Sequence, residues 1–213
     1  MPVAPERAYL NAVVYDRPEA LAAAYDELAS AYDRIGARWT VWVPPAHREA
    51  TQLLERAGHV LDAAPELMGR ELYQVERPPD DTPDGWTRDG NLAEVATVND
   101  RAYSNDTRSF EHALRHLPEG AAHLYTVREG GEAVASTVVV DYDGNADVEL
   151  VAVVPEARGR GLSGQLLAHA LADAADRGCE STALVATKLG RPVYERLGYR
   201  PLGQLQMWER PRP

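Results

Sequence analysis

The sequence of 213 residues is 45% hydrophobic and 26% charged, which is enough apolar material to bury one substantial core or two smaller ones. Its formal net charge of −11 argues against nucleic acid as a partner, because duplex binding needs a basic face that neutralises phosphates. No apolar run reaches membrane-spanning length and no signal-peptide pattern opens the sequence, so we expect a cytoplasmic protein without a membrane partner.

The first part of the chain has a pattern of alternating strands and helices. Residues 10–15 and 39–43 are typical of strands. Between them, the alanine-rich residues 19–35 predict a helix that stops at Gly36. A second short helix is expected within residues 52–59, so that residues 1–77 are predicted to form a small βαβα domain.

A linker is predicted next. Residues 78–85 combine three prolines, three aspartates and a glycine, a composition that disfavours both a helix and a central strand. We therefore expect a domain boundary here, with a second domain over residues 86–213.

Hydrophobic periodicity predicts both helices and strands in this second domain. The helix at residues 162–177 has apolar residues at helical spacing and stops at Gly178. The full predicted order is helices at 92–103 and 109–117, strands at 124–127, 133–140 and 149–154, the helix at 162–177, a strand through Val185, a short helix at 192–197 and a strand near 205–208.

A glycine-rich loop joins the apolar strand at residues 149–154 to the helix that follows it. The run is Arg158-Gly159-Arg160-Gly161-Leu162-Ser163-Gly164. Glycines let the backbone turn tightly and approach a ligand, and the first N–H groups of a helix are free to hold phosphate oxygens. A simple turn or an RNA-binding Arg-Gly tail is the alternative, but the run is single and lies between folded segments of an acidic chain. We predict a pyrophosphate-binding loop.

The two halves of the chain resemble each other. Residues 52–59 (QLLERAGH) echo residues 192–199 (PVYERLGY), and the elements around them come in the same order. This indicates a degenerate internal duplication, with chance similarity as the alternative. At the place of the glycine loop, residues 15–19 contain no glycine and two carboxylates, which would repel phosphate. The first half is therefore expected to have a structural role and to bind no nucleotide there.

Two motifs carry a resemblance to a known family. Residues 153–162 (VVPEARGRGL) and 186–199 (ATKLGRPVYERLGY) resemble the GNAT acetyltransferase superfamily, and the likeness covers residues 86–213. The resemblance implies an α/β (α+β) fold with a mixed, splayed sheet flanked by helices, preceded here by a smaller degenerate half-domain. It also implies an N-acetyltransferase that moves the acetyl group of acetyl-CoA to a primary amine by direct attack on the thioester. Ser163 departs from the Gly or Ala of many relatives but is small enough to preserve the backbone approach.

The same resemblance implies a set of residues that bind the acyl donor. Backbone groups of the strand would pair with the pantetheine arm, and an amide of this strand would polarise the thioester carbonyl. Amides from the glycine loop would hold the pyrophosphate, and two cations could reach the adenosine phosphate unless they are simply solvated charges at a helix start. These residues are Val151, Ala152, Val153, Arg158, Gly159, Arg160, Gly161, Leu162, Ser163, Gly164, Lys188 and Arg191.

The resemblance makes Tyr194 the general acid that protonates the departing CoA thiolate, with simple packing as the alternative. Glu149 and Asp147 lie two apart on one face of the ligand strand, where family members often place a base. Glu149 is the first candidate. Either carboxylate could instead be a solvating charge at the sheet, and a chain of waters could replace a dedicated base.

The acceptor site is expected at the junction of the first two helices of the second domain. Its candidate residues are Tyr103, Asp106, Phe110 and His112. His112 and His116 are four apart, as in a metal pair, but no third ligand is evident and no metal is predicted.

The sequence leaves two other functions open, and it also leaves open whether the chain forms a homodimer. The chain could be a non-catalytic acyl-CoA-binding regulatory module, or an enzyme that acts on protein N-termini or lysines. A small-molecule or peptide amine is the expected acceptor, but the sequence does not identify it or decide whether the first half contributes to its site. An exposed sheet edge of the first half could form a homodimer.

Overall fold

The structure is a computed structural model that describes residues 8–44, 46–73, 75–79, 85–88, 90–104, 110, 120 and 122–211. The chain divides into two compact units: unit 1 comprises Met1–Glu66 with Gly203–Pro213, and unit 2 comprises Leu67–Leu202. These bounds differ from the predicted domains at 1–77 and 86–213, because each predicted domain has one strand that belongs to the sheet of the other unit. The strand Glu66–Glu71 pairs in unit 2, and the strand Gln206–Glu209 pairs in unit 1. Most of the predicted linker, residues 78–85, lies outside the described residues.

Unit 1 is built on a four-stranded sheet in the order β1-β2-β11-β3. Helix α1 has a proline in its first turn and ends at Gly36, whose φ of 64° lies in the left-handed region that favours glycine. Its core contains Leu21, Trp39 and Leu54, which are almost fully buried. Its elements are η1 (Ala8–Leu10), β1 (Ala12–Val13), α1 (Pro18–Ile35), β2 (Thr40–Val43), α2 (Arg48–Arg56), β3 (Val60–Ala63) and β11 (Gln206–Glu209).

Strand β11 is held in unit 1 by polar contacts as well as by backbone pairing. Nδ1 of His59 lies 3.2 Å from the carbonyl oxygen of Trp208, and Nε2 of His59 lies 2.9 Å from the hydroxyl oxygen of Tyr25. Nε of Arg38 donates to a carboxylate oxygen of Glu209 at 2.7 Å. Strand β11 is therefore an interior strand of this unit's sheet.

Unit 2 contains a seven-stranded sheet in the order β10-β4-β9-β8-β7-β6-β5. The pairs β5–β6, β6–β7 and β7–β8 are antiparallel, whereas β8 and β9 pair in parallel, so the sheet is mixed. The strands are β4 (Glu66–Glu71), β5 (Trp86–Thr87), β6 (His123–Glu129), β7 (Glu132–Tyr142), β8 (Asn145–Val153), β9 (Ser181–Ala186) and β10 (Arg200–Gln204). The helices are α3 (Leu92–Ala102), η2 (Pro155–Ala157), α5 (Leu162–Asp176) and α6 (Arg191–Arg196).

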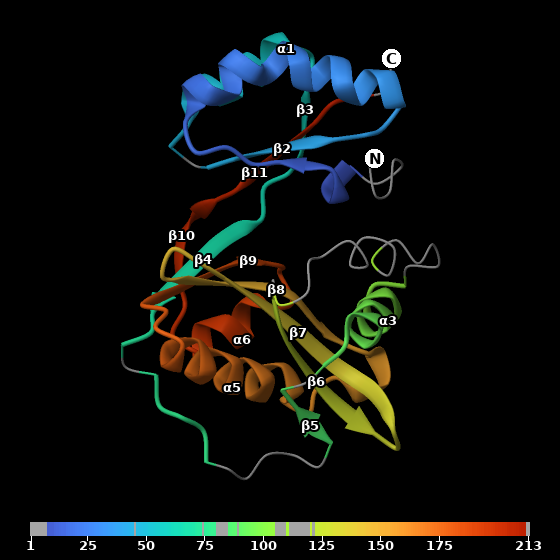
Figure 1. Cartoon of the computed structure of the whole chain (residues 1–213), viewed down its shortest axis with the longest axis vertical. Coiled ribbons are helices and arrows are strands. Elements are labelled where there is room, and N and C mark those ends of the chain that lie inside the picture. Colours follow the sequence, from blue (N-terminus) through green and yellow to red (C-terminus); the bar gives the residue numbers. More distant parts are fainter. Residues whose placement is uncertain are drawn as a thin grey trace. The chain divides into compact units, whose positions relative to one another are not determined.

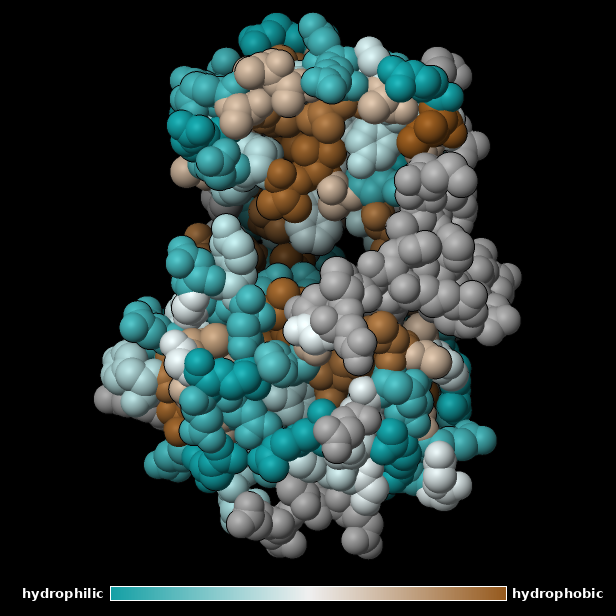
Figure 2. Space-filling view, in the orientation of Figure 1, coloured by the Kyte–Doolittle hydropathy of each residue, from teal (hydrophilic) through white to brown (hydrophobic). Residues whose placement is uncertain are grey.

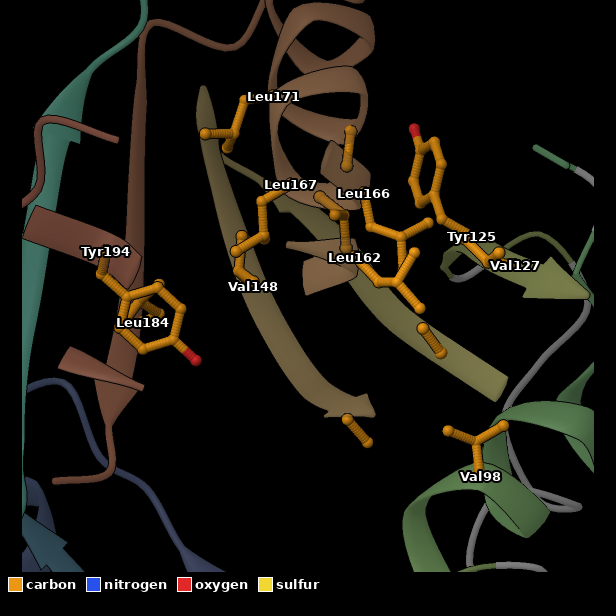
Figure 3. Close-up of a cluster of buried hydrophobic side chains, with 14 of the residues drawn as sticks. Val98, Tyr125, Val127, Val148, Leu162, Leu166, Leu167, Leu171, Leu184 and Tyr194 are labelled. Atoms are coloured by element: carbon orange, nitrogen blue, oxygen red, sulfur yellow. The ribbon is translucent and has the colours of Figure 1, made fainter. Parts of the chain in front are cut away.

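Apolar side chains cover both faces of this sheet. Val139 of β7 belongs to the cluster that contains Leu166 and Leu167 of α5, all of them fully buried. Figure 1 shows α5 lying against the sheet, and Figure 3 labels the two leucines within this cluster. Its neighbour Val138 packs with Val95 of α3 instead, because successive side chains of a strand point to opposite faces. Helices therefore pack on the sheet from both sides, which confirms the predicted α/β fold.

The two units repeat one order of elements and exchange one strand each. The series β1-α1-β2-α2-β3 in unit 1 matches β8-α5-β9-α6-β10 in unit 2, and both series begin with a parallel strand pair. Strand β11 lies between β2 and β3, and β4 lies at the equivalent position between β9 and β10. This reciprocal strand exchange supports the predicted internal duplication.

The surface is largely hydrophilic, as expected for a chain in which 26% of the residues are charged. Hydrophilic residues dominate much of the visible face of unit 2, with smaller apolar areas between them (Figure 2). Among the described helices, we find none that is long and apolar enough to cross a membrane.

Candidate active site

The central feature of unit 2 is a splay between two parallel strands. Strands β8 and β9 pair from Asn145 opposite Ser181 to Val148 opposite Leu184. Both continue beyond this point, β8 to Val153 and β9 to Ala186, without further pairing in this register. The backbone groups at the end of β8 on this side are thus open to another extended molecule.

A bulge in β8 begins where the splay begins. Glu149 pairs with Val138 of β7, but Ala152 pairs with Ser136, so β8 contains one extra residue between these points. Leu150, within this interval, has a φ of 51°, which is uncommon for a residue with a side chain. Such a bulge re-aims backbone groups and is often found beside a functional site.

A cleft of about 360 Å³ occupies the splay. This volume lies in the range of ligand sites. One wall is the end of β8, and the opposite wall is formed by the segment that leads into α6 and by that helix. The lining residues are Ala102, Tyr103, Val151, Ala152, Val153, Ala157, Arg158, Gly159, Arg160, Gly161, Leu162, Ser163, Thr187, Leu189, Gly190, Val193 and Tyr194.

The glycine loop forms one end of this cleft. Gly159 and Gly161 have φ values of 77° and 79°, and a Cβ atom at either position would meet nothing within 4 Å. Gly161 directly precedes α5, and no side chain caps the free amides of the first turn. The loop therefore offers open backbone and a helix N-terminus to an anion, and the residues present fit the pyrophosphate of acetyl-CoA.

The arginine side chains of the loop are engaged with the protein. Arg158 donates to the carbonyl oxygens of Val153, at 3.2 Å, and Ala102, at 2.6 Å. Arg160 forms a two-point ion pair with Glu129 at 2.9 and 2.5 Å, which lowers the pKa of that carboxyl group. The backbone amides, rather than these guanidinium groups, are thus the available donors.

A second cleft, of about 490 Å³, shares Gly161, Ser163 and Val193 with the first. Gly164 and Arg196 also line it. Arg196 is three residues after Val193 on α6, so the two side chains lie on one helix face. Sequence reasoning missed Arg196, because no local pattern in the sequence marks it as a cleft residue.

The two cations expected at the adenosine phosphate do not line either cleft. Lys188 is exposed in the turn before α6. Arg191 donates to Glu195 at 2.8 Å, one turn along the same helix. Their contact with a phosphate stays a prediction.

Tyr194 lies at the cleft with most of its side chain buried. It is 6% exposed, and its ring packs against Tyr199 with the centroids 6.0 Å apart. A Cβ atom at Gly190 would come within 2.8 Å of the Tyr194 ring, so the missing side chain there makes room for it. In Figure 3 the hydroxyl group points toward the carboxyl-terminal half of β8. Burial raises the pKa of the phenol, so it is protonated and able to donate at neutral pH.

Glu149 and Asp147 are partly buried on one face of β8. Burial, together with the charge of Asp147, raises the pKa of Glu149 to about 7, and burial also raises the pKa of Asp147. Among the described residues, no cation offsets this effect at either carboxyl group. Glu149 is near enough to Tyr194 for its charge to raise the tyrosine's pKa. The structure thus brings the predicted base and acid to one region.

The predicted acceptor residues have different outcomes. Tyr103 follows α3 and lines the cleft beside the end of β8. Phe110 packs against the cluster formed by Val95 and Val138. Asp106 and His112 lie outside the described residues. Within the part of the chain that the structure describes, no group of three potential ligands could hold a metal ion.

Unit 1 has neither the loop nor the tyrosine. Its helix α1 begins after Arg17 in a segment without glycine. The fully buried Leu54 occupies the position in the repeat that Tyr194 has in unit 2. Unit 1 thus lacks counterparts of the glycine loop and of Tyr194, which line the cleft in unit 2.

A comparison with protein families decides which family the chain belongs to. The model of the acetyltransferase (GNAT) family matches residues 71–199, which include the splay, the glycine loop and Tyr194. The chain is a GNAT acetyltransferase family member. Membership in this GNAT family implies acetyl transfer that depends on an acyl-CoA.

Solved structures share the fold of this GNAT protein at low identity. A GCN5-related N-acetyltransferase from Kribbella flavida is 21% identical, with a TM-score of 0.65 over 93% of this chain and 78% of that one. A GCN5-related N-acetyltransferase from Sphaerobacter thermophilus is 18% identical, with a TM-score of 0.66 over 98% and 75%. A tandem GNAT protein from the clavulanic acid biosynthesis pathway is 14% identical, with a TM-score of 0.60 over 89% and 69%. The search of curated proteins gave no match.

Proposed function

We propose that this protein is an acetyl-CoA-dependent N-acetyltransferase whose acceptor is a primary amine of a small molecule or peptide. One observation carries the proposal: a single cleft has the glycine loop at one end and Tyr194, close to Glu149, at the other. The first end suits a pyrophosphate, and the second has Tyr194 as a proton donor, with Glu149 near it as a proton acceptor. Acyl transfer from a thioester to an amine needs both groups.

The acyl donor would lie along the end of β8 as an added strand. Backbone groups of Val151 and Val153 would hold the pantetheine arm, and amides of the glycine loop would hold the pyrophosphate. The bulge at Leu150 would aim an amide of β8 at the thioester carbonyl, where negative charge develops during attack. Arg196 in the second cleft is placed to meet a phosphate on the adenosine side.

The proton transfers then follow from the two titratable groups. Glu149, with a pKa of about 7, accepts the proton that the acceptor ammonium must lose, directly or through water. The amine nitrogen attacks the carbonyl carbon, the N–C bond forms and the C–S bond breaks. Tyr194 gives its proton to the departing thiolate, whose own proton affinity makes this transfer useful. No covalent enzyme intermediate is required.

The first experiment separates binding from turnover. Acetyl-CoA is titrated calorimetrically into the full chain, and a panel of primary amines is then screened for acetylated product by mass spectrometry. Saturable binding and product that Tyr194→Phe suppresses would support the proposal. Binding without turnover over small-molecule and peptide amines would favour the alternative, a non-catalytic acyl-CoA-binding module.

We propose action in the cytoplasm, without a nucleic-acid or membrane partner, and assembly into a homodimer. Strand β3 is an edge of the unit 1 sheet, and its Val60 and Leu61 are 52% and 49% exposed. An apolar sheet edge of this kind can pair with a second copy. A monomeric mass in light scattering would refute the dimer.

A further inference from the structure

The connection between β4 and β5 crosses the sheet of unit 2 on the face that α5 covers. Strand β5 is one edge of this sheet, whereas β4 is the second strand from the opposite edge. Side chains of the connection contact α5, and in Figure 1 the chain that leaves β4 runs past this helix. Residues 75–79, which lead out of β4, can therefore take part in a site beside α5.

One carboxylate of α5, that of Asp173, holds this connection at two points. Nη1 of Arg77, which follows β4, donates to Oδ1 of Asp173 at 3.3 Å, and Nε of Arg88, directly after β5, donates to Oδ2 at 2.7 Å. Arg77 also pairs with Asp176, one turn further along α5. Exposed ion pairs contribute little by themselves, but here the shared side chain is only 15% exposed and the charges form a network. Asp173 thus fixes the chain both before and after β5.

The contacts on the β5 side continue to the second cleft. The guanidinium carbon of Arg88 lies 4.9 Å from the centroid of the Trp86 ring. That ring packs against the ring of His169 on α5, with the centroids 4.6 Å apart, and His169 lines the second cleft. The groups around Asp173 are therefore packed against a residue of this cleft.

The chain on the β4 side forms part of the cleft itself. Pro78 and Pro79, directly after Arg77, line the second cleft together with residues of α5 and α6. Their rings restrict the backbone and present apolar surface without an N–H donor, which suits contact with a flat base. Because this cleft shares Gly161 and Ser163 with the first, a donor whose pyrophosphate lies on the glycine loop would extend its adenosine end into it.

We propose that Asp173 is a positioning residue for the acyl donor: its two arginine contacts fix Pro78 and Pro79 as a wall of the second cleft, against which the adenosine end of the donor packs. Asp173 acts through this wall and does not touch the donor. Because the wall is in place before the donor arrives, binding does not have to order this segment. The proposal rests on the proposed function, which supplies the acyl-CoA.

Calorimetric titration of acetyl-CoA into the full chain tests this role in a double-mutant cycle. Asp173→Asn keeps the shape of the side chain but removes its charge, and should raise the Kd about fivefold, the scale of the cost of ordering such a group on binding. A variant with both Pro78→Ala and Pro79→Ala should raise the Kd by a similar factor. Combining all three substitutions should cause no further loss, because Asp173 acts through the proline wall.

Asp176→Asn is the matched control. It takes a partner from Arg77 at a side chain that is 66% exposed and leaves both contacts of Asp173 in place, so the Kd should not change. If Asp173→Asn does not fold, Arg77→Met takes its place in the cycle, since it removes one of the two contacts at a partly exposed side chain.

The outcomes separate this proposal from the proposed function. Failure of the native protein to bind acetyl-CoA would overturn both. An unchanged Kd in Asp173→Asn would overturn the positioning role alone, and a lowered thermal unfolding midpoint in the same variant would then give Asp173 a purely structural role. Losses of affinity that add in the combined variant would also overturn the proposal, because Asp173 would then act by a route other than the proline wall.

Discussion

Burial raises the proton affinity of both Glu149 and Tyr194, and the two groups are left with complementary roles, one as a base and one as an acid. An acid group in an apolar environment holds its proton more tightly, so the pKa of both groups rises. For Glu149 the result, about 7, is that of a base that works near neutral pH. For Tyr194 the result is a phenol that keeps its proton until a stronger base forms beside it.

The rate should therefore report the ionisation of Glu149. Since the base acts in its ionised form, kcat/KM for acetyl transfer should rise with pH to an inflection near 7 and level off above it. Glu149→Gln should lower kcat/KM by about 10²-fold and remove this inflection. The measurement is a pH profile with the best amine from the screen.

Asp147→Asn is the matched control for that profile. Its lost charge should move the inflection of Glu149 to lower pH, because the charge of Asp147 raises the pKa of Glu149. If the inflection disappears in Asp147→Asn and persists in Glu149→Gln, then Asp147 is the base.

Tyr194→Phe should separate chemistry from binding. Phenylalanine keeps the ring that packs against Tyr199 but removes the proton donor. We expect kcat to fall about 10²-fold while the Kd for acetyl-CoA and the thermal unfolding midpoint stay unchanged. An unchanged kcat would mean that Tyr194 has a packing role and is not the general acid.

Single residues were predictable where a motif fixed their place and not where tertiary packing did. The motif that precedes Gly198 and Tyr199 singled out Tyr194, and strand alternation placed Glu149 and Asp147 together. Arg196 was missed because its value depends on the cleft between α5 and α6, which no local pattern reveals.

At the scale of elements, the loop and the first turn of α5 act as one anion site. Gly161→Glu should weaken acetyl-CoA binding at least tenfold, because the new carboxylate enters the open space beside the glycine loop and repels phosphate. Gly161→Ala is the matched control, since it has the same strain at a φ of 79° without the charge. Equal losses in both variants, measured by calorimetry, would mean that backbone strain rather than charge is responsible.

Periodicity located most elements but not the features that open the cleft. The helix at α5 and the strand at β8 have clear patterns in the sequence. The bulge has none, because Leu150 is a residue for which a left-handed φ is unusual. The sequence does not indicate that the pairing of β8 with β9 ends after Val148 either, because this pairing joins two strands far apart in sequence. The resemblance to a family, rather than local propensity, predicted the splay.

At the scale of the whole molecule, the predicted domains differ from the units because of the reciprocal strand exchange. A prediction made in chain order assigns each strand to the half that contains it. Here β4 and β11 each pair with the other half's sheet. Pairing over such separations leaves no local signal, so the duplication was predictable and the exchange was not.

Removing residues 206–213 should unfold unit 1 selectively. The deletion takes β11 from between β2 and β3 and removes Trp208, which is 7% exposed in the core. Loss of a buried tryptophan alone costs about 3–5 kcal/mol. We expect hydrogen exchange to show lost protection in β2 and β3 and retained protection in α5.

Tyr142→Ala serves as the control for the deletion, because Tyr142 is 79% exposed and its truncation should leave exchange unchanged. Full protection of β2 in the deleted protein would contradict the exchanged arrangement.

The exchange also sets the order in which this chain can fold during synthesis. Arg38 and its partner Glu209 are separated by 171 positions, so the sheet of unit 1 cannot close until residue 209 has left the ribosome. Strand β4, in contrast, emerges early and must wait with unpaired edges for β9 and β10. Contacts of such long range make folding slow and expose strand edges in the meantime. The edges of β2 and β4 are therefore expected to stay unpaired in the nascent chain until the strands that flank them have emerged.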